Sequence, residues 1–314
     1  SIGLLLGAGL CVQALALGWL HVEGYAGVAI FALCLALSST AIVVEGLKAH
    51  GATHTPYGQA ILELMLFQDV VAVVGMSLLG LPGEGQSVGE KWSPVSLLLQ
   101  FVVFTGAAIF LGRTVLVRII ERIRYDEGLL VIFVLGLAAG LGGLAMQNGF
   151  SPTMAGFLAG VALSFTPHRS AIEYRIEPLK VFGVTIYFIF MGVTLPLNHL
   201  AWGLFWPVVL VTVLIVGVRP LCSVWLARWG GMSSREATRF GLSIGQGSEF
   251  SMILAASALH VGMFDESAFL VVVLASVLSM VISSWVQLSF QGRGFISAVE
   301  ADAPAMEGTS VAGE

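Results

Sequence analysis

Apolar residues occur along the chain in stretches of about twenty, each ended by a short polar or charged connection. A helix of this length crosses the hydrocarbon core of a bilayer, because each residue adds about 1.5 Å. The pattern predicts an all-α polytopic membrane protein with about ten transmembrane helices, at residues 3–20, 24–46, 59–81, 95–118, 128–147, 151–166, 181–198, 201–228, 236–259 and 266–289. Because the connections are short, we expect one membrane domain over residues 1–293 and a disordered tail over 294–314.

Composition agrees with this class of protein. Hydrophobic residues make up 57% of the chain and charged residues only 11%, whereas soluble domains carry about 25% charged residues. There is no basic tract, so we expect no nucleic-acid partner. The motifs of phosphate loops, nucleophile–base pairs and metal clusters are missing from the sequence, so we expect neither an enzyme nor a cofactor.

Basic residues predict the orientation of the helices in the membrane. Twelve of the fourteen Lys and Arg residues flank the spans on one side, and Lys91 alone lies on the other. The positive-inside rule then places both termini on the cytoplasmic or equivalent face. One of the basic clusters, in residues 168–180, alternates charges with Ile and Leu at helical spacing, which predicts an amphipathic linker lying at the interface.

Asp69 lies near the centre of the third predicted span, with no other charge within several residues. A carboxylate at that depth costs about 3 kcal/mol or more to insert, so it requires a proton, a cation or a charged partner. Glu63 is six residues earlier, about 240° around the helix, and therefore faces another direction.

Two spans carry polar interruptions at comparable depth. Ser38, Ser39 and Thr40 interrupt the second span, and residues 245–248 (GQGS) interrupt the ninth. Glycine weakens a helix, and hydroxyls compete for its backbone groups, so both segments are expected to be helix breaks. Spans one to three and eight to ten would then form an inverted repeat, with both breaks facing a shared ion site.

Four segments resemble the signature blocks of the monovalent cation:proton antiporter family 2, and most closely its Kef-type potassium/proton antiporters. They are residues 38–41 (SSTA), 67–69 (FQD), 155–160 (AGFLAG) and 245–250 (GQGSEF). The resemblance runs from about residue 3 to residue 287, without the family's first two or three helices, so the chain is expected to be N-terminally incomplete. The regulatory nucleotide-binding domain of Kef proteins is not matched either, so its gating is not carried over.

The resemblance implies a core of two crossed, discontinuous helices that moves against a scaffold in a homodimer. The essential carboxylate of the family corresponds to Asp69, preceded by Gln68. The first crossover corresponds to residues 38–41 and the second to Gly245, Gln246, Gly247 and Ser248. The family's basic residue on the preceding helix corresponds to Arg219.

These observations predict exchange of a monovalent cation for protons by alternating access, with potassium favoured over sodium. The expected ligands are the Asp69 carboxylate, the Gln68 amide, the Ser39 and Thr40 hydroxyls, and carbonyls freed at the breaks. If Asp69 is the only titrating carrier, the exchange is electroneutral, because Arg219 stays charged. Glu249 is expected to compensate the charge of Arg219, although it could also bind a proton. A sodium-coupled symporter for organic anions and a non-transporting membrane subunit are the alternatives.

Overall fold

The computed structural model describes residues 22–49, 51–79, 94–123, 125–147, 152–195 and 202–291. Within these residues the protein is helical, and the only strand-like pairing is an isolated bridge between Val22 and Phe264. The α-helices are α2 (Gly24–Ala36), α3 (Thr40–Ala49), α4 (Pro56–Leu79), α5 (Pro94–Leu111), α6 (Val117–Ile123), α7 (Glu127–Gln147), α8 (Pro152–Ser164), α9 (Arg169–Thr194), α10 (Phe205–Val213), α11 (Arg219–Trp229), α12 (Ser234–Ser243), α13 (Glu249–His260) and α14 (Glu266–Gln291).

Seven stretches of the described residues are long and apolar enough to cross a membrane, which supports an integral multi-pass protein. They are Gly24–Ala49, Pro56–Met76, Val102–Ile123, Gly128–Gln147, Arg169–Val193, Trp202–Trp229 and Glu266–Val286. Each corresponds to one predicted span. Short π-helical turns, Gly112–Leu116 and Leu214–Val218, join α5 to α6 and α10 to α11.

The other three predicted spans differ from expectation. The span at 3–20 lies outside the described residues, as does the tail at 294–314. The span at 151–166 is the apolar helix α8, whose 13 residues are fewer than a straight crossing needs. The span at 236–259 is divided into α12 and α13 by a non-helical segment. The inverted-repeat relation stays a prediction, because the first span of one triplet is not described.

The prediction that residues 168–180 form a linker separate from the next span was wrong. These residues are the first half of α9, which continues without interruption from Arg169 to Thr194 and contains Pro178. A proline inside a helix removes one backbone hydrogen bond but does not always end the helix. The amphipathic segment and the apolar span that follows it therefore form one rod.

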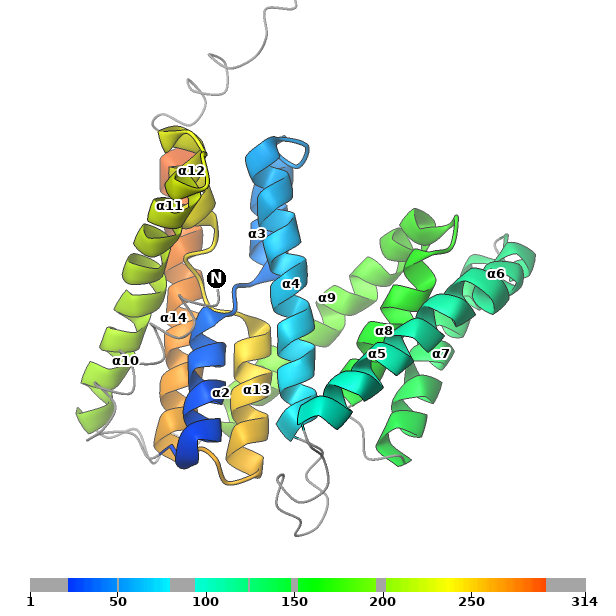
Figure 1. The fold of residues 1–314 in the computed structure, drawn as a ribbon, viewed down its shortest axis with the longest axis horizontal. Coiled ribbons are helices and arrows are strands. Elements are labelled where there is room, and N and C mark those ends of the chain that lie inside the picture. Colours follow the sequence, from blue (N-terminus) through cyan, green and yellow to red (C-terminus); the bar gives the residue numbers. More distant parts are fainter. Residues whose placement is uncertain are drawn as a thin grey trace, which may run out of the picture.

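The helices form two groups (Figure 1). One contains α2 to α4 and α10 to α14, and the other contains α5 to α8. Helix α9 runs from the second group to the first, where Met191 joins the largest apolar core. A smaller cluster joins the groups a second time, between Val73 of α4 and Met154 and Leu158 of α8.

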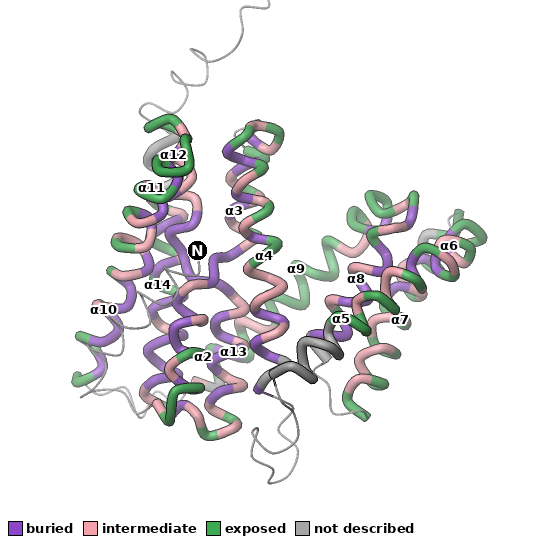
Figure 2. Tube along the Cα trace, viewed as in Figure 1, coloured by how far each residue is buried: buried purple, intermediate pink, exposed green. Residues whose placement is uncertain are grey.

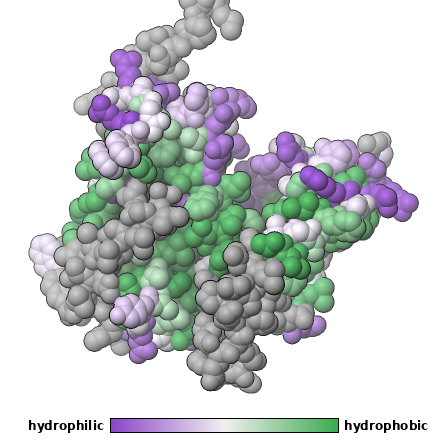
Figure 3. Space-filling model, viewed as in Figure 1, coloured by the Kyte–Doolittle hydropathy of each residue, from purple (hydrophilic) through white to green (hydrophobic). Residues whose placement is uncertain are grey.

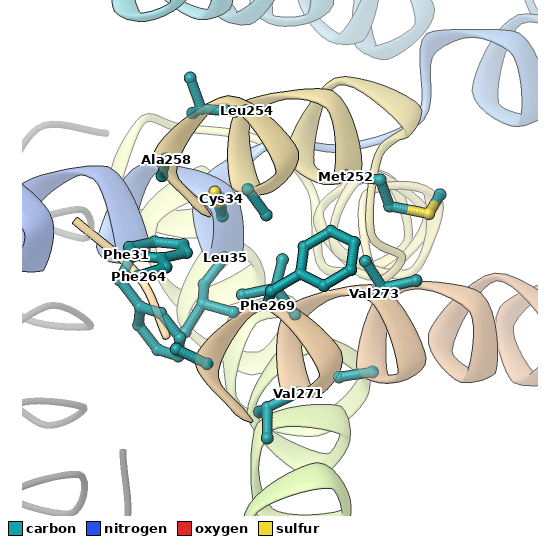
Figure 4. Close-up of a cluster of buried hydrophobic side chains, with 14 of the residues drawn as sticks. Phe31, Cys34, Leu35, Met252, Leu254, Ala258, Phe264, Phe269, Val271 and Val273 are labelled. Atoms are coloured by element: carbon teal, nitrogen blue, oxygen red, sulfur yellow. The ribbon is translucent and has the colours of Figure 1, made fainter. Parts of the chain in front are cut away.

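The largest core fills the space between α2, α13, α14 and α10 (Figure 4). Phe31 of α2 packs edge-on against Phe264, with ring centroids 5.8 Å apart, and Phe269 of α14 belongs to the same cluster. Buried residues concentrate in this group, whereas α7 and α9 are largely exposed (Figure 2). The core therefore surrounds the lower halves of the two interrupted helices.

The surface of the first group is mainly hydrophobic, and hydrophilic residues gather at the ends of the helices (Figure 3). One such end includes the last turn of α3, where Lys48 lies, and the start of α12. This distribution suits a membrane protein, because the hydrophobic surface contacts lipid while the charged ends of the helices remain in water. The cytoplasmic position of these ends stays a prediction.

Candidate functional site

Two interrupted helices cross at the centre of the first group (Figure 1). Below the crossing α2 lies beside α13; above it, α3 packs on α4 and α12 packs on α11. The first break is residues 37–39, where Leu37 has an extended backbone (φ −73°, ψ 141°). The second is residues 244–248, which ends at Ser248 (φ −126°, ψ 149°). The sequence predicted breaks at residues 38–40 and 245–248. In the structure Thr40 belongs to α3, and the non-helical segments also include Leu37 and Ile244.

Gln68 of α4 holds the first break. Its side-chain oxygen accepts a hydrogen bond from the Ser38 N–H (3.0 Å), and its side-chain nitrogen donates to the Ala36 carbonyl (3.3 Å). These are backbone groups that an uninterrupted helix would satisfy internally. Both ends of the amide are therefore used on the backbone, so Gln68 positions the break beside the neighbouring carboxylate.

Asp69 faces the crossing. The Thr40 hydroxyl, at the first residue of α3, donates to both carboxylate oxygens of Asp69 at 3.1 and 3.2 Å. Residues four before and three after Asp69 on the helix, Met65 and Ala72, are buried, so the carboxylate lies on the face of α4 that packs inward. Leu66, three residues before Asp69, and Phe67 are exposed, so Asp69 lies at the edge of this buried face. The acid is half-buried beside the break.

The second break is held from α14. The Gly247 N–H donates to the Ser279 hydroxyl (2.8 Å), and the Ser283 hydroxyl donates to the side-chain oxygen of Gln246 (2.6 Å). The Ser248 hydroxyl caps α13 by accepting from the Phe250 N–H. The four residues that supply these side-chain oxygens are buried. Water does not reach these oxygens, so the hydrogen bonds within the protein satisfy them instead.

One backbone hydrogen bond joins the two breaks directly. The Ser39 N–H of the first break donates to the Gly247 carbonyl of the second at 3.0 Å. The Ser38 hydroxyl makes a further link by donating to the Ile244 carbonyl at 3.1 Å. The crossing is therefore a hydrogen-bonded contact between two extended segments.

Arg219 lies partly buried at the same crossing and forms hydrogen bonds with both breaks. Its guanidinium donates to five acceptors: the carbonyls of Leu35 (2.8 Å), Leu37 (3.0 Å), Ile244 (3.0 Å from Nε) and Gln246 (2.5 Å), and the Ser38 hydroxyl (2.5 Å). Nη2 also donates to the Ile244 carbonyl. Most of these carbonyls are freed where α2 and α12 end, and a cation is favourable at such C-terminal ends.

The guanidinium partners differ from the acidic partner expected from sequence, because all five are neutral oxygens. Glu249 is instead the first residue of α13, where an acid is favourable at the positive end of the helix dipole. Its charge acts electrostatically on Asp69 and on Tyr187 of α9. The two acids therefore share one electrostatic environment beside the N-termini of α3 and α13.

All of the residues predicted for the site lie at or beside the crossing: Ser38, Ser39, Thr40, Gln68, Asp69, Arg219, Gly245, Gln246, Gly247, Ser248 and Glu249. Glu63 is exposed and lies outside the crossing. Sequence reasoning missed Ser276, Ser279 and Ser283 of α14, although their spacing places them on one helix face. Within the described residues, no group of three or more His, Cys, Asp or Glu side chains could hold a metal ion.

Glycines allow the second break to lie against its neighbours. A Cβ atom added to Gly247 would fall 2.8 Å from both Cα and Cβ of Ser276, and one added to Gly245 would fall 2.7 Å from Cγ of Pro220. Real side chains do not approach this closely, so the second break would have to move away from α14 in the first case and from α11 in the second. The glycines are thus required by space at the crossing.

We expect Gly247→Ala to lower the stability of the folded protein by about 1–3 kcal/mol, because the added methyl overpacks a rigid contact. Thermal unfolding of the purified protein in detergent measures the change. Gly183→Ala in α9 is the matched control, since nothing lies within 4 Å of the added methyl there; its stability should stay within about 0.5 kcal/mol of the wild type. Equal melting temperatures for both variants would contradict the close packing.

Residues 1–288 match a protein family described as the sodium/hydrogen exchanger, transmembrane. The match covers both breaks, Asp69, Arg219 and the serines of α14.

Proposed function

Because the chain belongs to the sodium/hydrogen exchanger transmembrane family, we propose that Asp69 carries protons and a monovalent cation in turn, by alternating access. Membership makes the chain a cation:proton antiporter domain of a multi-pass membrane protein. The observation that supports the role of Asp69 is its position at the crossing, where the Thr40 hydroxyl donates to both carboxylate oxygens.

Competition at one carboxylate is sufficient for exchange. A half-buried acid inside a membrane is most stable when it is neutralised, either by a proton or by a cation. Hard oxygen ligands suit alkali ions, and the Asp69 carboxylate, the Thr40 hydroxyl and the Ser39 hydroxyl supply such oxygens around the first break. The proton must leave before the cation binds, so opening the site to each side in turn couples the two flows.

Arg219 is a fixed charge in this scheme. Its donors are occupied by five oxygens of the two breaks, and an arginine stays protonated under transport conditions. If Glu249 keeps one protonation state through the cycle, Asp69 exchanges one proton for one cation. We therefore propose electroneutral exchange, with potassium preferred over sodium because the sequence blocks resemble Kef-type antiporters.

Two further parts of the proposal concern assembly and sidedness. The resemblance supports a homodimer whose scaffold contacts lie outside the crossed helices. The distribution of basic residues supports a cytoplasmic position for the ends of α3 and α11, where Lys48 and Arg228 lie.

The experiment is a transport assay on the purified protein in proteoliposomes loaded with a pH-sensitive dye. Adding K⁺ or Na⁺ outside should drive protons out of the vesicles, with K⁺ effective at the lower concentration. In voltage-clamped vesicles the exchange should produce no current that scales with the transport rate. Uptake that needs an organic anion together with Na⁺ would indicate the symporter, and no cation-driven proton movement would contradict antiport.

A further inference from the structure

Helix α14 carries three buried hydroxyls on one face, beside the second break. Ser276, Ser279 and Ser283 are 1%, 0% and 4% exposed, and their spacing of three and four residues aligns them along the helix. A buried hydroxyl is costly unless it forms hydrogen bonds, so a row of three in an apolar helix requires an explanation.

Ser279 lies at the start of a chain of contacts that ends at Asp69. Its hydroxyl donates to the Ser276 carbonyl (2.7 Å) and accepts from the Gly247 N–H (2.8 Å). The Gly247 carbonyl in turn accepts from the Ser39 N–H (3.0 Å). The residue after Ser39 is Thr40, whose hydroxyl donates to both oxygens of Asp69.

The contact between Gly247 and α14 leaves little freedom for adjustment. A methyl group on Gly247 would lie 2.8 Å from Ser276, so the break already rests on the helix. Without the Ser279 hydroxyl, the buried Gly247 N–H would lose its acceptor, and the break would have to shift to find another. Any such shift reaches Ser39 through the Gly247 carbonyl.

We propose that Ser279 is a positioning residue for the ion site: through Gly247 and Ser39 it sets the place of the Thr40 hydroxyl against Asp69. This inference rests on the proposed function, in which Asp69 is the carrier. It assigns to α14 a part in cation affinity, in addition to its packing in the core.

The test is a double-mutant cycle on transport, with the KM for K⁺ and for Na⁺ measured at fixed pH in proteoliposomes. Ser279→Ala should raise the KM for the transported cation by about 3- to 10-fold, the effect of one hydrogen bond. In a Thr40→Ala background the same change should alter KM by less than about 2-fold, because its route to Asp69 is already lost. Ser257→Ala is the control, since the Ser257 hydroxyl donates to the Ile253 carbonyl of its own helix α13, and the KM of this variant should match that of the wild type.

An unchanged KM in Ser279→Ala, or an equal rise in both backgrounds, would overturn the inference. Should Ser279→Ala not fold, Ser279→Cys keeps the space filled and offers a weaker acceptor; the same cycle with a smaller rise is then expected. Transport by the wild-type protein distinguishes failure of this inference from failure of the proposed function. Absence of cation-driven proton movement in the wild type rejects both, whereas wild-type exchange with an additive cycle rejects the role of Ser279 alone.

Discussion

Asp69→Asn is expected to abolish cation-driven proton movement in proteoliposomes, the largest functional effect of any single substitution in this chain. An amide neither releases a proton nor neutralises a cation, so both halves of the exchange lose their carrier. The fold should survive, because the amide oxygen still accepts the hydrogen bond that Thr40 donates to Asp69. Proton efflux after addition of K⁺ or Na⁺, compared at equal amounts of reconstituted protein, measures the effect.

Glu63→Gln is the control for this substitution. It removes a carboxylate from the same helix, but Glu63 is exposed and lies away from the crossing. Its exchange rate should remain near that of the wild type, and both variants should melt at about the wild-type temperature. Retained exchange in Asp69→Asn would exclude Asp69 as the carrier.

Arg219→Ala is expected to cause the largest loss of stability, at least about 3 kcal/mol, because several buried carbonyls at the crossing lose their donor together. Arg219→Lys should fall between the alanine variant and the wild type. Lysine keeps the charge, but its donors radiate from one nitrogen and cannot reach Leu35, Ser38 and Gln246 at once. Thermal unfolding in detergent ranks the three proteins.

Arg228→Ala is the matched control, since Arg228 lies on the same helix α11 and is exposed to solvent. We expect it to change stability by less than about 0.5 kcal/mol. A stable Arg219→Ala protein would show that water or another side chain replaces the guanidinium. Equal stability of the alanine and lysine variants would show that the positive charge itself contributes nothing.

The sequence was sufficient to predict where two helices are interrupted and which acid lies beside them, because these features depend on residue type. A carboxylate in the middle of an apolar span is costly, and Gly, Ser and Thr weaken the helices around it, so Asp69 and both breaks could be predicted. These features depend on residues that are close together in the chain, so they can be predicted from a single sequence.

The partners of these residues could not be predicted, because they are backbone groups freed only when the helices break. Arg219 was expected beside an acid, whereas the structure surrounds it with carbonyls from two segments more than 200 residues apart in sequence. The hydrogen bonds of the Gln68 amide to the Ser38 N–H and the Ala36 carbonyl could not be predicted either. The continuity of α9 through Pro178 was also missed. A pattern of charged residues indicates which part of a helix is exposed, but it does not indicate where the helix ends.

The bond between Ser39 and Gly247, reinforced by Arg219, has a consequence for how the protein could move. Neither interrupted helix can tilt alone without leaving buried carbonyls of the crossing unpaired, which is costly for every group involved. Displacement of Asp69 toward either surface would therefore carry both helices together, with α14 attached. The surfaces that slide past each other would then lie where α4 contacts α8, at Val73, and where α9 contacts the largest core, at Met191. Substitutions at these two residues should therefore change the rate of transport.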